Sequence, residues 1–174
     1  MRKVLVAALC LAFLLPWAIK VEAQGSSRPN PTPQPGAKGL TWQLLATNPT
    51  SGTIDVGCGP SCNAYQGDTP CTTALPLLCI KKSGAGFPLP LPTSVTSSQY
   101  HTWSGGIVGT TSPMVPPSTL VAADAVCAQA FGAGWRVIEF HDGWGWNLQA
   151  YGGLGNPASR VWIHINDQPS TCWH

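Results

Sequence analysis

Six cysteines constrain the fold of this chain more than any other feature of its sequence. They are Cys58, Cys62, Cys71, Cys79, Cys127 and Cys172, and a seventh, Cys10, precedes them. An even set of cysteines in an exported chain of this length is typical of a disulfide framework, whereas cytosolic thiols stay reduced. A disulfide framework therefore requires that the chain be exported from the cytosol.

Residues 1–23 have the three parts of a secretory signal peptide. Arg2 and Lys3 precede an apolar run over residues 4–19, and the small residue Ala23 ends the segment. The alternative is a membrane anchor, but a bilayer-spanning helix needs about 20 apolar residues. We therefore expect cleavage after Ala23, loss of Cys10 with the leader, and a secreted, extracellular or periplasmic protein with no membrane span in the mature chain.

The spacing of the six remaining cysteines favours one set of pairs. The first four lie close together between Cys58 and Cys79, and we expect them to pair among themselves. Cys127 would then pair with Cys172 and close a long loop. A zinc site at Cys58-x3-Cys62 is the alternative, although the spacings lack the repeated CxxC form of such sites.

Composition excludes some classes of partner. Nine basic and seven acidic residues leave a net charge of +2, so no basic surface exists to attract nucleic acid. Charged residues make up 9% of the chain, against about 25% in an ordinary soluble domain. The 19 glycines and 17 prolines favour short elements and irregular backbone.

The chain divides into a Pro-rich linker over residues 24–39 and a single disulfide-rich domain over residues 40–174. In the linker, alternate prolines favour an extended, polyproline-like arm. Within the domain, residues 40–47 and 100–111 contain candidate strands, residues 58–79 form a Cys-rich loop region, and residues 143–155 form a glycine- and aromatic-rich loop.

The later elements have clearer patterns. Leu120, Ala123, Cys127 and Ala130 form one stripe, which predicts a helix over residues 119–131. Segments 136–141 and 161–166 alternate as strands do, with Val161, Ile163 and Ile165 facing the core and Trp162, His164 and Asn166 facing away. The predicted fold class is α+β, with one main helix on short antiparallel strands, loop-rich and disulfide-stapled.

From residue 100 onward, this order of elements resembles C-type-lectin-like domains, in the broad sense that includes endostatin-like extracellular modules. The resemblance rests on a glycine-led strand at Gly105, the helix with Cys127, two strands and the last cysteine. It implies a Cys127–Cys172 disulfide and carbohydrate binding. Asn166 and Asp167 resemble the calcium-ligating element of sugar-binding members, but no Glu-Pro-Asn or Gln-Pro-Asp triplet accompanies them. Segments 134–143 and 164–169 also resemble motifs of a bacterial secreted family.

Three polar residues form a candidate metal site. Glu139, His141 and His164 lie on the outward faces of the two predicted strands, where they would converge if the strands pair. Two imidazoles and a carboxylate suit zinc or iron, with Asp142 or Asp167 in reserve. The possible cofactor is therefore a divalent metal, with copper and calcium as further candidates. The alternative is that these side chains hydrogen-bond the loop backbone. A metal-dependent secreted enzyme is therefore the alternative function, although the sequence identifies no catalytic residue.

The aromatic residues of segment 143–162 favour a binding function. Trp144, Trp146 and Tyr151 lie in the glycine-rich loop beside Asn147, and Trp162 is on the outward face of the last strand. Exposed rings with flanking amides suit sugar recognition, whereas tryptophan is also a common core residue. We expect a secreted binding module for an extracellular glycan or other surface polymer, with these five residues at the site. A structural coat or adhesion protein without a site is a further alternative.

Overall fold

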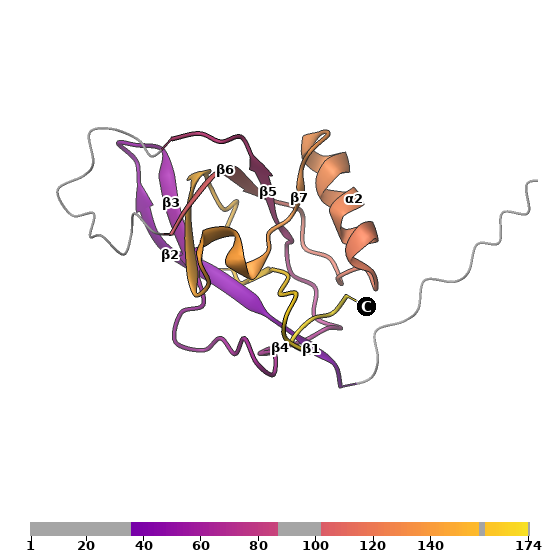
Figure 1. Cartoon of the computed structure of the whole chain (residues 1–174). Helices are drawn as coiled ribbons and strands as arrows, with labels where there is room; N and C mark the ends of the chain where they lie inside the picture. Colours follow the sequence, from indigo (N-terminus) through magenta and orange to yellow (C-terminus); the bar gives the residue numbers. More distant parts are fainter. Residues whose placement is uncertain (1–35, 87–101, 157–158, 174) are drawn as a thin grey trace, which may run out of the picture.

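The structure, a computed structural model, describes residues 36–86, 102–156 and 159–173 (Figure 1). The predicted signal peptide and most of the predicted linker lie outside these residues. Within them the fold is mixed α+β, as the sequence predicts. The elements in chain order are β1 (Lys38–Gly39), β2 (Thr41–Asn48), β3 (Thr53–Gly57), β4 (Thr69–Pro70), β5 (Leu78–Lys82), β6 (Trp103–Thr110), α2 (Leu120–Phe131), β7 (Arg136–Val137), the 3-10 helix η1 (Phe140–Gly143), β8 (Asn147–Gly152) and β9 (Val161–Trp162).

Seven strands form one curled sheet in the order β7-β5-β6-β8-β3-β2-β9, while β1 and β4 form a separate pair. Neighbouring strands are antiparallel, except that β6 and β8 are parallel. Two isolated bridges, Leu77 with Trp162 and Glu139 with His164, connect β9 and the residues after it to segments beside β5 and β7. The backbone N–H of His164 also donates to the carbonyl of Ile138 over 2.9 Å. These contacts tie the two edges of the sheet together.

The main core lies inside the curled sheet. Because alternate residues of a strand point to the same face, Leu78 and Ile80 of β5 enter this core together. Val161, Ile163 and Ile165 enter it from the other edge, and all three are buried, which confirms the predicted apolar face. Burial of each such side chain stabilises the fold by roughly 1.5–3 kcal/mol.

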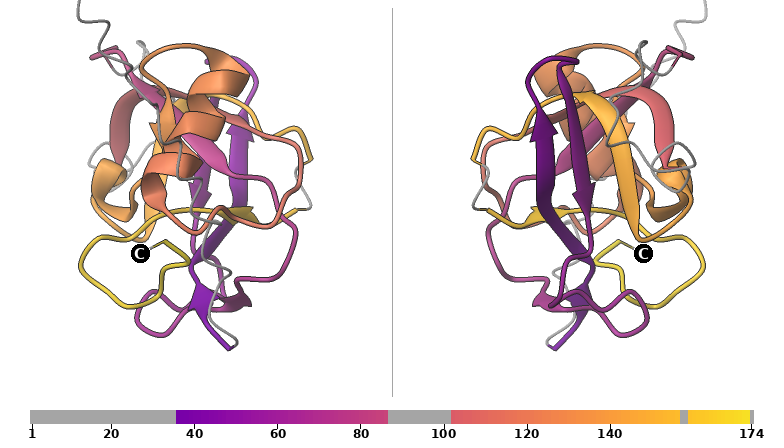
Figure 2. Two further views of the ribbon diagram at one scale, coloured as in Figure 1. Left: turned by 90° about the vertical axis from the view of Figure 1, so that its right-hand side faces the viewer. Right: turned by 90° about the vertical axis from the view of Figure 1, so that its left-hand side faces the viewer.

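Helix α2 packs on the outer side of the sheet over a second core, which joins Cys127 of the helix to Cys79 and Trp162 of the strands (Figure 2). The helix follows Thr119, whose side chain accepts a hydrogen bond from the N–H of Ala122 over 3.2 Å. It ends at Gly132, whose φ of 102° suits glycine. The predicted helix is confirmed. No helix among the described residues is both long enough and apolar enough to span a membrane.

The disulfides differ from the predicted pairs. Cys58 bonds to Cys62, Cys71 to Cys172 and Cys79 to Cys127. The expected Cys127–Cys172 bond is therefore wrong, as is pairing of the first four cysteines only among themselves. The physical reason is tertiary: α2 lies on β5, so the helix cysteine meets Cys79. The Cys58–Cys62 disulfide also replaces the alternative zinc site.

Several predicted boundaries are also wrong. The predicted strand over residues 136–141 is strand only at β7, because the chain then turns into η1. The predicted loop over residues 143–155 contains β8, which lies between β6 and β3 in the middle of the sheet. The linker does not extend to Gly39, since the N–H of Cys71 donates to Ala37 over 2.9 Å and Gly39 is buried. A Cβ at Gly39 would lie 2.5 Å from the Cys172 sulfur, which explains why glycine is needed there.

Candidate functional site

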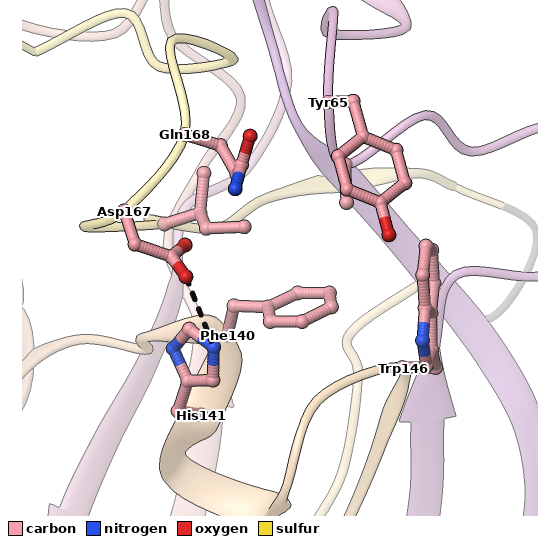
Figure 3. Close-up of a pocket in the computed structure, with 8 residues that line it drawn as sticks. Tyr65, Phe140, His141, Trp146, Asp167 and Gln168 are labelled. Atoms are coloured by element: carbon pink, nitrogen blue, oxygen red, sulfur yellow. Dashed lines mark ion pairs between the residues drawn. The ribbon is translucent and has the colours of Figure 1, made fainter.

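A cavity of about 180 Å³ opens where three distant parts of the chain meet (Figure 3). The loop after β3, the η1–β8 region and the segment after β9 each contribute to its wall. The bridge between Glu139 and His164 holds the second and third of these parts side by side. The lining residues are Ala64, Tyr65, Phe140, His141, Trp146, Ile165, Asp167 and Gln168. We call this space the aromatic cavity.

Three aromatic rings form one side of the aromatic cavity. Phe140 is almost fully buried and contacts Trp42 of the core, with ring centroids 5.9 Å apart. Trp146 meets Phe140 edge to face at 5.5 Å, and Tyr65 meets Trp146 at 6.0 Å. Trp146 is 51% exposed and Tyr65 is 60% exposed. The site therefore has a fixed apolar floor and two rings that remain open to a ligand.

Polar groups form the opposite side of the aromatic cavity. Asp167 and Gln168 follow β9, and the Asp167 carboxylate lies 3.7 Å from Nε2 of His141 (Figure 3). The other ring nitrogen of His141, Nδ1, lies 3.0 Å from Oε1 of Glu139. Because a carboxylate only accepts, Nδ1 carries the proton in the neutral ring and Nε2 faces Asp167.

Glu139 fixes the polar side of the cavity. Besides the His141 ring, its carboxylate accepts the backbone N–H of His141 over 2.7 Å and that of Asn166 over 3.3 Å. The Asp142 carboxylate in turn accepts the N–H of Glu139 over 2.8 Å, which completes a capping box at the start of η1. One side chain thus holds the turn, the histidine and the segment after β9 in register.

Trp144 occupies an unusual backbone conformation next to this turn. Its φ is 79°, the only positive value at a non-glycine residue among the described residues. Left-handed backbone at a bulky residue costs roughly 1–2 kcal/mol, and burial does not compensate, because Trp144 is 80% exposed. Such conformations cluster at ligand-binding sites. Trp144 does not line the aromatic cavity, but its backbone N–H donates to the carbonyl of His141 over 3.3 Å, and it lies on the same loop as Trp146.

Only some of the predicted binding residues meet here. Trp146 lines the aromatic cavity and Trp144 lies on the same loop. Asn147 donates to the Asp55 carboxylate over 3.2 Å, and Tyr151 packs edge to face on Trp103 at 5.1 Å.

The prediction that Trp162 faces a ligand is wrong. Its side chain does point away from the main core, as the alternation predicts, but the second core covers it and it is fully buried. Of Asn147, Tyr151 and Trp162, none lines the aromatic cavity.

The predicted metal ligands do not gather into one site. Glu139 contacts His141, but Glu139 and His164 line a second cavity of about 380 Å³, whereas His141 lines the aromatic cavity. No group of three or more His, Cys, Asp or Glu side chains within the described ranges is arranged to hold a metal ion. The physical reason is the turn of η1, which replaces the strand on which Glu139 and His141 were expected to share a face. The Glu139 carboxylate instead accepts the backbone N–H groups of His141 and Asn166, as the alternative interpretation expects of it, and the His141 ring bonds to Glu139.

The second cavity is held by charge pairs. Asp142 accepts two hydrogen bonds from Arg136, at 2.6 and 2.8 Å, and lies 3.1 Å from Nζ of Lys82. Burial alone would raise the pKa of Asp142, but the Arg136 and Glu139 hydrogen bonds and the positive charge of Arg136 hold that pKa below its ordinary value. Burial lowers the pKa of His164 below its ordinary value.

Five of the eight lining residues were not predicted as site residues: Ala64, Tyr65, Phe140, Ile165 and Gln168. Phe140 was assigned only to a core face, and no local pattern connects Tyr65 to Trp146, which lies 81 positions later. Comparisons with protein-family models, curated proteins and solved structures gave no match to this chain. The site therefore has to be interpreted from its own geometry.

Proposed function

We propose that this protein is an exported binding module that recognises a glycan or other surface polymer through the aromatic cavity. Three disulfides support export to an oxidising compartment. A C-type-lectin-like relationship of residues 100–174 stays part of this proposal. The binding function does not depend on that relationship, because Tyr65, Phe140 and Trp146 form the aromatic side of the cavity and lie outside the calcium-ligating pattern, to which Asp167 belongs.

The observation that carries the proposal is the division of the cavity into an aromatic and a polar side. A sugar ring presents C–H groups on its faces and hydroxyl groups around its edge. Aromatic faces carry partial negative charge and pack well against such C–H groups. Asp167 and Gln168 stand across from the rings, where they can accept and donate hydrogen bonds at the edge of the sugar.

Preorganisation strengthens this interpretation. Phe140 is fixed by Trp42, and His141 is fixed by Glu139, so little side-chain ordering is required on binding. The alternative of a metal-dependent enzyme lacks comparable support, since Glu139, His141 and His164 do not face one cavity.

The test is a Trp146→Ala variant. Intrinsic tryptophan fluorescence is titrated with soluble glycans, and insoluble polysaccharides are used in pull-down assays. Removal of the ring should weaken binding at least about tenfold, or about 1.4 kcal/mol, the scale of a lost aromatic contact.

Val121→Ala is the control, because Val121 is an exposed hydrophobic residue that lies on α2 and does not line the aromatic cavity. Thermal unfolding of both variants shows whether the fold is kept. Absence of wild-type binding across a glycan array and the pull-downs would overturn the proposal, and so would equal losses in the two variants.

A further inference from the structure

We infer that the aromatic cavity selects a single uncharged sugar unit and discriminates against acidic sugars such as uronic acids. This inference rests on the proposed function, and it concerns which class of glycan the site accepts. It follows from the size of the cavity and from the charges that surround it.

The size of the cavity fits one ring. Its volume is about 180 Å³. Pockets for drug-sized ligands begin at about 300 Å³. Trp146 and Tyr65 close one side of the cavity, and His141 and Asp167 close the other (Figure 3). The neighbouring sugar units of a bound glycan chain would therefore have to extend out through the open face.

The charges of the cavity are wrong for an acidic ligand. None of the eight described residues that line it is Lys or Arg, and Asp167 places a carboxylate at its polar side. A uronic acid would bring a second carboxylate toward Asp167 without a cation to pair with. Like charges placed opposite each other lower affinity and exclude the wrong partner.

Cations close to the site in the sequence are already engaged elsewhere. Arg136 and Lys82 both pair with Asp142. Arg160, the cation nearest in sequence to Asp167, donates to Ser61 and Thr41 and pairs with Asp68. Each of these three cations is therefore paired with a carboxylate, and none of them lines the aromatic cavity.

His141 does not supply the missing positive charge. Its Nδ1 faces Glu139 at 3.0 Å and its Nε2 faces Asp167 at 3.7 Å. A protonated His141 would therefore stand between two carboxylates, and the group as a whole would keep a net negative charge. Carboxylates accept hydrogen bonds, so the hydroxyl and amide N–H groups of an uncharged sugar suit the polar side of the cavity better than a second carboxylate does.

The experiment compares matched neutral and acidic sugars. Methyl glycosides of glucose, galactose and mannose are titrated beside the corresponding methyl uronosides, which differ only in a carboxylate at C6. The readouts are tryptophan fluorescence and ligand-observed NMR at low ionic strength. For each neutral sugar that binds, we expect its acidic partner to bind at least about tenfold more weakly.

Asp167→Asn and Asp167→Lys separate charge from shape. The side chain of Asp167 is 55% exposed, so both variants should fold. Asp167→Asn should reduce the discrimination, and Asp167→Lys should reverse it. Gln129→Lys adds one positive charge at an exposed position on α2 and should leave the discrimination unchanged.

The outcomes distinguish this inference from the proposed function. If neutral and acidic partners bind the wild type equally, or if neither Asp167 variant changes their ratio, the inference is overturned while glycan binding stands. If no sugar or polysaccharide binds the wild type, the proposed function itself fails, and the inference fails with it.

Discussion

Trp144 combines a backbone conformation that favours glycine with a large, exposed side chain. A φ of 79° favours glycine, yet the position holds the largest side chain and exposes 80% of it. Selection for stability alone would favour glycine here. We interpret the tryptophan as retained for contact with a ligand, because its loop also contains Trp146 of the aromatic cavity.

Trp144→Gly should therefore be more stable than Trp144→Ala by about 1 kcal/mol, because both lack the ring and only alanine keeps the strained backbone. Chemical denaturation of the two variants measures the difference directly. Both should bind glycan more weakly than the wild type. Equal stability of the two variants would show that the backbone at this position is not strained in solution.

Individual residues also show what the sequence can and cannot predict. The alternation in segment 161–166 correctly predicted that Ile163 faces the core and that Trp162 faces away from it. It could not show whether the outward face meets solvent or a second layer. For Trp162 that layer is α2 and the C-terminal segment, which local alternation does not encode.

At the scale of elements, Asp142 connects β5, β7 and η1. Its carboxylate is only 6% exposed and pairs with Lys82 and Arg136, and it also accepts the N–H of Glu139. Loss of its charge leaves these donors with a weaker partner. Since Lys82 and Arg136 are partly exposed, water replaces some of what is lost.

Asp142→Asn should lower the free energy of unfolding at neutral pH by about 1–3 kcal/mol. The pKa of Asp142 is lowered in the folded state, so its contribution is present above the ordinary value of 3.8 and is lost as pH falls through the folded pKa. The wild type should therefore lose more stability than the variant between pH 5 and pH 2. Denaturant unfolding at several pH values measures this, and parallel curves for the two proteins would contradict it.

Elements were predictable where the local signal was strong. The helix over residues 119–131 has a cap, an apolar stripe and a terminal glycine, and it forms as predicted. Strand β8 was missed because Trp144, Gly145 and Trp146 directly before it have the composition of a loop, while Leu148 and Ala150 give only a short apolar alternation. Its place between β6 and β3 comes from pairing with distant strands.

For the whole molecule, disulfides connect the layers. Cys79–Cys127 joins the sheet to α2 with a sequence separation of 48, and Cys71–Cys172 joins the end of β4 to the C-terminal segment with a separation of 101. Long loops constrain the unfolded chain most, by about 4–5 kcal/mol each in the chain-entropy account. Spacing along the sequence predicted a different set, because it contains no information on which layers are stacked.

The two sets of pairs predict different products of tryptic digestion. Under denaturing, non-reducing conditions with free thiols blocked, trypsin releases residues 39–81, 83–136 and 161–174. The first peptide contains Cys71 and Cys79, the second Cys127 and the third Cys172. With the pairs of the structure, all three peptides remain covalently joined in one species, because Cys79 holds the second peptide and Cys71 holds the third.

Pairing of Cys127 with Cys172 would instead release residues 39–81 as a separate peptide and leave the other two joined. Mass spectrometry before and after reduction distinguishes these products, and a reduced, alkylated sample is the control for complete cleavage. A free 39–81 peptide would contradict the stacking of α2 on β5.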